Sequence, residues 1–80
     1  MSTNRFTVNL ELEIVIDLDD EVTTRVNDEW RRDFYNLHKP EEIAEHIARN
    51  IVINHWPLSH LDGWADLPDN MAKVISWETL

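Results

Sequence analysis

Paired carboxylates are the first side chains in this 80-residue sequence that could do chemistry. Glu11 and Glu13 lie in a segment of alternating polar and apolar residues. Because a strand rises about 3.3 Å per residue, their side chains would stand on one face roughly 6.6 Å apart. Such a pair serves acid-base catalysis when a cleft raises the pKa of one carboxyl group. A strand of so small a protein is not expected to line a deep cleft, so we interpret both carboxylates as facing solvent or a partner.

Other candidate catalytic and metal-binding groups are weaker. Ser59 and His60 are adjacent, which turns their side chains apart in regular backbone, so they do not form a nucleophile and base. Glu42 and His46 would share one face of a helix but supply two metal ligands at most. A looser set could hold a divalent ion only if its loop curled around the metal, and we favour surface and capping roles for its members: His55, His60, Asp62, Asp66 and Asp69.

Composition removes several further classes of site. The single glycine excludes a phosphate-binding P-loop and a dinucleotide-binding fingerprint, since both need several glycines for close backbone approach. The absence of cysteine removes disulfides, thiolate nucleophiles and cysteine-based metal sites. The sequence therefore predicts a protein that is not an enzyme and that binds no metal or cofactor.

The strongest functional signal is negative charge. Sixteen Asp and Glu residues against seven Lys and Arg give a net charge of −9, and six of the acids lie between Asn9 and Thr24 without a single base. Such a field repels nucleic acid and anionic membranes and attracts a basic protein surface. The alternative is that the acidity only keeps a small protein in solution.

We predict that two groups of carboxylates form the partner-binding surface. The first group is contiguous, has no neighbouring base to neutralise it, and lies on or next to one exposed strand face: Glu11, Glu13, Asp17, Asp19, Asp20 and Glu21. The second group lies in another base-free stretch: Asp62, Asp66 and Asp69. Both groups are expected to face a surface rich in Lys and Arg.

The elements that would position these side chains follow from hydrophobic periodicity. From Arg5 to Leu18 every even-numbered residue is apolar and every odd-numbered residue but one is polar, which predicts one long strand with one buried face. The segment from about Asp20 to Leu37 repeats apolar residues about every fourth position and predicts an amphipathic helix. Asn27 and Asp28 could break this helix and cap a second piece.

Three further elements complete the predicted chain. A second helix is expected to begin at Pro40 and to end before Pro57. Ser59 and Asp62, three residues apart, resemble a capping box and predict a short helical turn from Ser59 through Leu67. The tail from Lys73 to Leu80 is rich in strand-forming residues and predicts a closing strand beside the first, with a terminal helix from Met71 as the alternative.

The predicted architecture is a single α+β domain over residues 1–80 in the order β-α-α-(α)-β. A small two-stranded sheet is packed by two main helices and a short third. So narrow a sheet leaves long unpaired edges, which a second copy of the chain could cover. We therefore expect a homodimer.

Four tryptophans in eighty residues bring a large apolar area. Trp30 and Trp77 fall on apolar faces of their elements and are predicted to lie in the core. Trp56 and Trp64 flank a proline-bounded loop and are predicted to anchor a partner or a dimer interface.

No membrane or export segment is expected. The longest purely apolar runs have three residues, and the stretch from Met1 to Leu10 lacks the apolar core of a signal peptide. We expect a soluble protein in the cytoplasm of a host cell.

Two stretches resemble a pattern found in small acidic proteins of phages and other mobile elements. They are residues 39–48, KPEEIAEHIA, and residues 58–69, LSHLDGWADLPD. In length, acidity and lack of an enzyme motif, the whole chain is similar to anti-CRISPR proteins, many of which occupy the basic groove of a host nucleic-acid-binding complex. The resemblance implies this type of mechanism and assigns no residue.

Two functions follow as hypotheses. The first is a non-enzymatic inhibitor whose carboxylates imitate a phosphate backbone and dock on a basic nucleic-acid-binding protein, without binding nucleic acid or membranes itself. The second is a structural or regulatory phage accessory protein, such as an antitoxin-like partner, that binds through an apolar surface bearing tryptophans. The first predicts binding that weakens steeply with salt, and the second does not.

Overall fold

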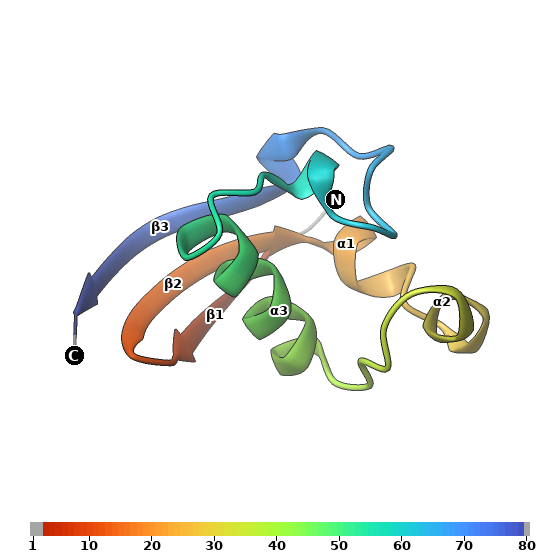
Figure 1. The fold of residues 1–80 in the computed structure, drawn as a ribbon, viewed down its shortest axis with the longest axis horizontal. Coiled ribbons are helices and arrows are strands. Elements are labelled where there is room, and N and C mark those ends of the chain that lie inside the picture. Colours follow the sequence, from red (N-terminus) through yellow and green to blue (C-terminus); the bar gives the residue numbers. More distant parts are fainter. Residues whose placement is uncertain (1–2, 80) are drawn as a thin grey trace.

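The fold combines a three-stranded antiparallel sheet with three helices. The computed structural model describes residues 3–79. The elements along the chain are β1 (Thr3–Asn9), β2 (Leu12–Asp19), α1 (Asp20–Thr24), α2 (Asp28–Asp33), α3 (Pro40–Val52) and β3 (Ala72–Thr79) (Figure 1). The predicted α+β class is confirmed, but the sheet has three strands, in the order β1-β2-β3, rather than two. Leu80, the last residue of the predicted closing strand, lies outside the described residues.

The predicted long strand is a hairpin of two strands. β1 and β2 pair antiparallel, with Val8 opposite Ile14, and the chain turns at Leu10 and Glu11. Even-numbered residues stand opposite even-numbered residues, so the apolar alternation runs through the turn without a break. The prediction of one strand was wrong because neither turn residue is of a type that marks a tight turn.

The predicted closing strand is confirmed, and the alternative of a terminal helix is wrong. β3 pairs antiparallel with β2, which is therefore the central strand. Val15 stands opposite Ser76 while Ile16 stands opposite Val74, so Ile75 is an extra residue on β3. This is a β-bulge, which bends the strand and shifts the alternation of its side chains.

The predicted helix from Asp20 to Leu37 is broken, as Asn27 and Asp28 had suggested. The Asn27 side chain accepts a hydrogen bond of 2.8 Å from the backbone N–H of Trp30 and so caps α2. α2 ends at Asp33, so the predicted end of the helix was several residues too late.

The second predicted helix is confirmed as α3. The Glu42 carboxylate accepts hydrogen bonds from the backbone N–H groups of Lys39 (3.0 Å) and His38 (3.1 Å), which lowers the pKa of Glu42 and fixes the start of the helix. α3 lies across one face of the sheet (Figure 1). Its buried stripe consists of Ile43, Ala44, Ile47 and Ala48.

The segment between α3 and β3 holds two 3₁₀ turns, Leu58–His60 and Asp69–Met71, rather than one helical turn. The expected cap of Ser59 by Asp62 is wrong. The backbone N–H of Ser59 instead donates a 2.9 Å hydrogen bond to the carboxylate of Asp69, which joins the two turns. Asp69, ten positions after Ser59, thus takes the place of the predicted partner Asp62.

Two of the four tryptophans are placed opposite to prediction. Trp64 is fully buried: its indole N–H donates a 2.9 Å hydrogen bond to the carbonyl of Val22, and its ring lies 4.8 Å from that of Trp30. Trp64 therefore presents no ring to a partner, and its predicted interface role is wrong. Trp30 is buried as predicted, whereas Trp77 is 58% exposed because it stands on an edge strand beyond the helix layer.

No helix in residues 3–79 combines the length and the apolar character needed to span a membrane.

Candidate binding surfaces

The outer face of the sheet, defined as the face opposite α3, carries most of the first predicted carboxylate group. Because Ile14, Ile16 and Leu18 are fully buried beneath the helices, the alternating residues of β2 point the other way. Glu13 and Asp17 therefore lie on the outer face. The register brings different neighbours to each of them, and these neighbours decide the local charge.

Asp17 is neutralised by bases on both neighbouring strands. It stands opposite Arg5 on β1 and Lys73 on β3. The Arg5 guanidinium donates two hydrogen bonds to the carboxylate, of 2.7 and 3.0 Å, and these hold the pKa of Asp17 below its usual value. The expectation that this carboxylate has no neutralising base was wrong, since the hairpin brings together residues twelve positions apart.

The hairpin end of the sheet keeps its negative charge. Glu11 is exposed at the turn, and Glu13 stands opposite Asn9 on β1 and Glu78 on β3. We call Glu11, Glu13 and Glu78 the hairpin acidic end. Like charges directly opposite each other destabilise a sheet, so a cationic partner at this position would be stabilising. Sequence reasoning missed Glu78 because its neighbour depends on the register of β3.

The carboxylates near α1 serve the fold in part. Asp19 accepts a 3.0 Å hydrogen bond from the backbone N–H of Glu21 and caps α1, and Asp20 accepts one of 2.8 Å from the Asn4 side chain. Glu21 is exposed in the first turn. This group therefore lies at the far end of β2 from the hairpin acidic end, and the predicted contiguous group is split in two.

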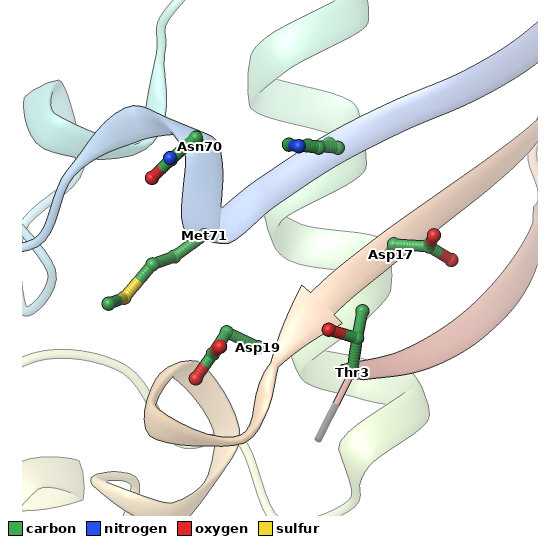
Figure 2. A pocket seen from close by; sticks show the side chains of 6 residues that line it. Thr3, Asp17, Asp19, Asn70 and Met71 are labelled. Atoms are coloured by element: carbon green, nitrogen blue, oxygen red, sulfur yellow. The ribbon is translucent and has the colours of Figure 1, made fainter. Parts of the chain in front are cut away.

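A polar hollow of about 350 Å³ opens beside this group. Figure 2 shows the carboxylates of Asp17 and Asp19 pointing away from each other, so they do not form a catalytic pair. The side chains that line the hollow come from all three strands and from the turn before β3: Thr3, Asp17, Asp19, Asn70, Met71 and Lys73.

The second predicted group has mainly structural partners. The Arg25 guanidinium donates hydrogen bonds of 2.6 and 3.2 Å to Asp66 and one of 3.1 Å to the carbonyl of Gly63. Asp69 joins the two 3₁₀ turns through Ser59. These contacts lower the pKa of both aspartates. Only the third member of the group, Asp62, is exposed with neither a hydrogen bond nor an ion pair among the described residues.

Ion pairing leaves a large excess of acids. Each of the four ion pairs between described residues is neutral, so the net charge of −9 is carried by the other side chains. Most of the excess is exposed. The pairs are Arg5–Asp17, Arg25–Asp66, Arg31–Asp28 and Arg49–Glu45.

Several large apolar side chains after the end of α3 and on β3 are exposed. Trp56 is 54% exposed, as its predicted anchoring role requires, and Ile53 and Ile75 are 45% and 46% exposed. A hollow of about 200 Å³ between the end of α3 and β3 is lined by Ile51, Val52, His55, Val74 and Trp77.

No three His, Asp or Glu side chains within residues 3–79 come together as they would to hold a metal ion.

His46 supplies a pH-dependent contribution to stability. Its ring lies 4.3 Å from that of Tyr35, and its buried Nε2 atom has no hydrogen-bond partner. Burial, with a smaller contribution from Arg49, lowers the pKa of His46 below its usual 6.5. The unfolded chain therefore takes up a proton that the folded chain does not, and this contribution to stability is lost as the pH falls below about 6.5.

We expect His46→Gln to weaken the pH dependence of unfolding between about pH 7 and pH 5. Urea unfolding of the two proteins at several pH values measures this. His60→Gln is the control, because His60 is exposed. Equal pH dependence of the wild type and His46→Gln would contradict the assignment.

Comparison with known proteins gives no relative: no family model matches the chain, and no curated protein or solved structure shows significant similarity to it.

Proposed function

We propose that this protein is a non-enzymatic inhibitor that occupies a basic nucleic-acid-binding surface of another protein or complex, in the manner of anti-CRISPR proteins. The observation that carries the proposal is the hairpin acidic end, where Glu11, Glu13 and Glu78 gather and none of the three forms an ion pair within residues 3–79. Carboxylates held at fixed spacing on a sheet can take the place of phosphates against Lys and Arg side chains.

Electrostatics favours competition with nucleic acid. The net charge of −9 creates a negative field that steers the protein toward a basic groove. The same field keeps it away from DNA, RNA and anionic membranes. Inhibition would then be steric and electrostatic, with no chemical step, and would take place in the cytoplasm of a host cell.

The proposed contact surface includes fewer carboxylates than the sequence predicted. Glu11 and Glu13 form its centre, and Glu21 and Asp62 are secondary exposed carboxylates. The remaining members of the two predicted groups are engaged within the fold: Asp17, Asp19, Asp20, Asp66 and Asp69.

The test is capture of a binding protein from host lysate on the immobilised chain, followed by elution in salt steps and by competition with DNA or RNA. We expect the captured protein to leave the column within a few hundred millimolar salt, since exposed charge pairs are screened over about 8 Å already at physiological ionic strength. Double-stranded DNA or single-stranded RNA should also displace it, because both would occupy the same basic surface.

We expect the double variant Glu11→Gln, Glu13→Gln to weaken binding about tenfold or more, because two charge-assisted contacts are lost. The control is Glu29→Gln, Asp33→Asn, which removes the same charge from exposed positions on α2. Both variants should unfold like the wild type. Equal loss of binding in the two variants would show that only net charge matters, and unchanged binding in the first would exclude this surface.

A second candidate function is supported by the 54% exposure of Trp56. An antitoxin-like accessory protein could bind its partner through this ring and Ile53, with little dependence on salt. In the same capture experiment, binding that resists salt and nucleic acid but is lost in Trp56→Ala would favour this function.

A further inference from the structure

The outer edge of β3 has no strand partner. Within residues 3–79, β3 pairs with β2 alone, so its other row of backbone N–H and C=O groups is free to pair (Figure 1). Its large apolar side chains are uncovered as well, with Ile75 46% and Trp77 58% exposed. The opposite edge strand, β1, differs, because its exposed side chains are polar and Val8 is buried.

The bulge in β3 places two opposite charges on one face. Lys73 stands opposite Asp17, and Glu78 stands opposite Glu13, so both point to the outer face. Residues five positions apart lie on opposite faces of a regular strand. The extra residue at Ile75 shifts the alternation by one position, so Lys73 and Glu78 lie on the same face.

We propose that two copies of this chain pair antiparallel through their β3 edges, about a two-fold axis at the bulge. In this register, Lys73 of each copy stands opposite Glu78 of the other on the outer face. Val74 of each copy stands opposite Trp77 of the other on the helix-covered face. The two three-stranded sheets then form one continuous six-stranded sheet.

Charge complementarity supports this register. Asp17 is already held by Arg5, which leaves Lys73 without a hydrogen-bonded partner among the described residues. Glu78 faces a like charge, Glu13, within its own chain. Pairing of the two copies gives each Glu78 a cation, and symmetry makes this contact twice.

Apolar contacts support the same register. Trp77 and Val74 both line the hollow of about 200 Å³ at the junction of α3 and β3. The Trp77 ring of each copy would lie beside Val74 of the other, an aromatic and β-branched pair of the kind that stabilises neighbouring strands. Two exposed rings would thus be covered at once.

A second copy fits this edge better than an extended segment of an unrelated protein. Lys73 and Glu78 both lie on β3. They meet only when the β3 strands of two copies pair with each other. The dimer pairs Glu78 with Lys73 of the other copy, but it leaves Glu11 exposed at the turn and Glu13 on the outer face. Its test by sedimentation does not depend on the proposed inhibitory function.

Charge reversal tests the register. Sedimentation velocity from about 1 to 300 µM, which spans weak to moderate association, should show a dimer for the wild type. Lys73→Glu and Glu78→Lys should each weaken the dimer about tenfold or more, because two attractive pairs become repulsive. The double variant should restore the affinity to within about threefold of the wild type. Arg32→Glu and Glu41→Lys are controls for charge far from β3.

Each outcome decides the proposal, provided that circular dichroism shows each variant to be folded. Loss in both single variants with rescue in the double variant supports it. A monomer at the highest concentration overturns it, as does a dimer that the single variants leave intact. Loss without rescue also overturns this register. A wild-type monomer that binds an extended peptide along β3 would assign the edge to a different protein.

Discussion

Gly63→Ala is expected to destabilise the protein by about 2 to 5 kcal/mol, a large part of the stability of a domain this small. Gly63 has φ +96°, a conformation that side chains oppose. A Cβ atom at this position would lie 2.5 Å from Cζ2 and 2.6 Å from Nε1 of Trp30. Chemical denaturation followed by far-ultraviolet circular dichroism measures the loss.

A double-mutant cycle separates the two causes. Trp30→Phe removes the indole atoms that the new Cβ would meet. In a protein that already carries Trp30→Phe, Gly63→Ala should therefore cost less stability than it does in the wild type. The remaining loss is the cost of the backbone conformation. An alanine variant as stable as the wild type would contradict both the positive φ and the close contact.

Trp64→Ala is expected to cost about 3 to 5 kcal/mol and to leave much of the protein unfolded. The ring is fully buried, and its N–H satisfies the carbonyl of Val22. Trp64→Phe should cost less, because most of the apolar contact remains, although the carbonyl loses its donor. Thermal unfolding compares the two variants.

Trp56→Ala is the matched control for this position. The same change at a ring that is 54% exposed should alter stability by no more than about 1 kcal/mol. Equal losses at the two positions would mean that the burial of Trp64 is wrong. The comparison also separates a structural tryptophan from one that is available to a partner.

Local signals in the sequence were sufficient for part of the fold. Pro40 and the carboxylates after it define the start of α3, and Asn27 marks the break between α1 and α2. The hairpin was not predictable from periodicity, because a turn centred on Glu11 keeps even-numbered residues on one face. The pattern of one long strand and the pattern of this hairpin are the same.

The binding surface was less predictable, because it depends on register. In one extended strand, Arg5 and Asp17 would be about 40 Å apart, whereas the hairpin brings their charged atoms to 2.7 Å. The burial of Trp64 likewise depends on Val22, 42 positions earlier. Its neighbours Gly63 and Pro68 are typical of a loop, and this local signal suggested exposure.

The position of β3 in the chain has a consequence for synthesis. β1 and β2 are adjacent along the chain and can pair as soon as both have left the ribosome, but β3 begins only at Ala72. At a translation rate of about 5 to 20 residues per second, β2 waits roughly 3 to 10 s for its second neighbour. During this time the nascent chain exposes an unpaired edge of its most apolar strand, so chaperone binding at this stage would favour productive folding.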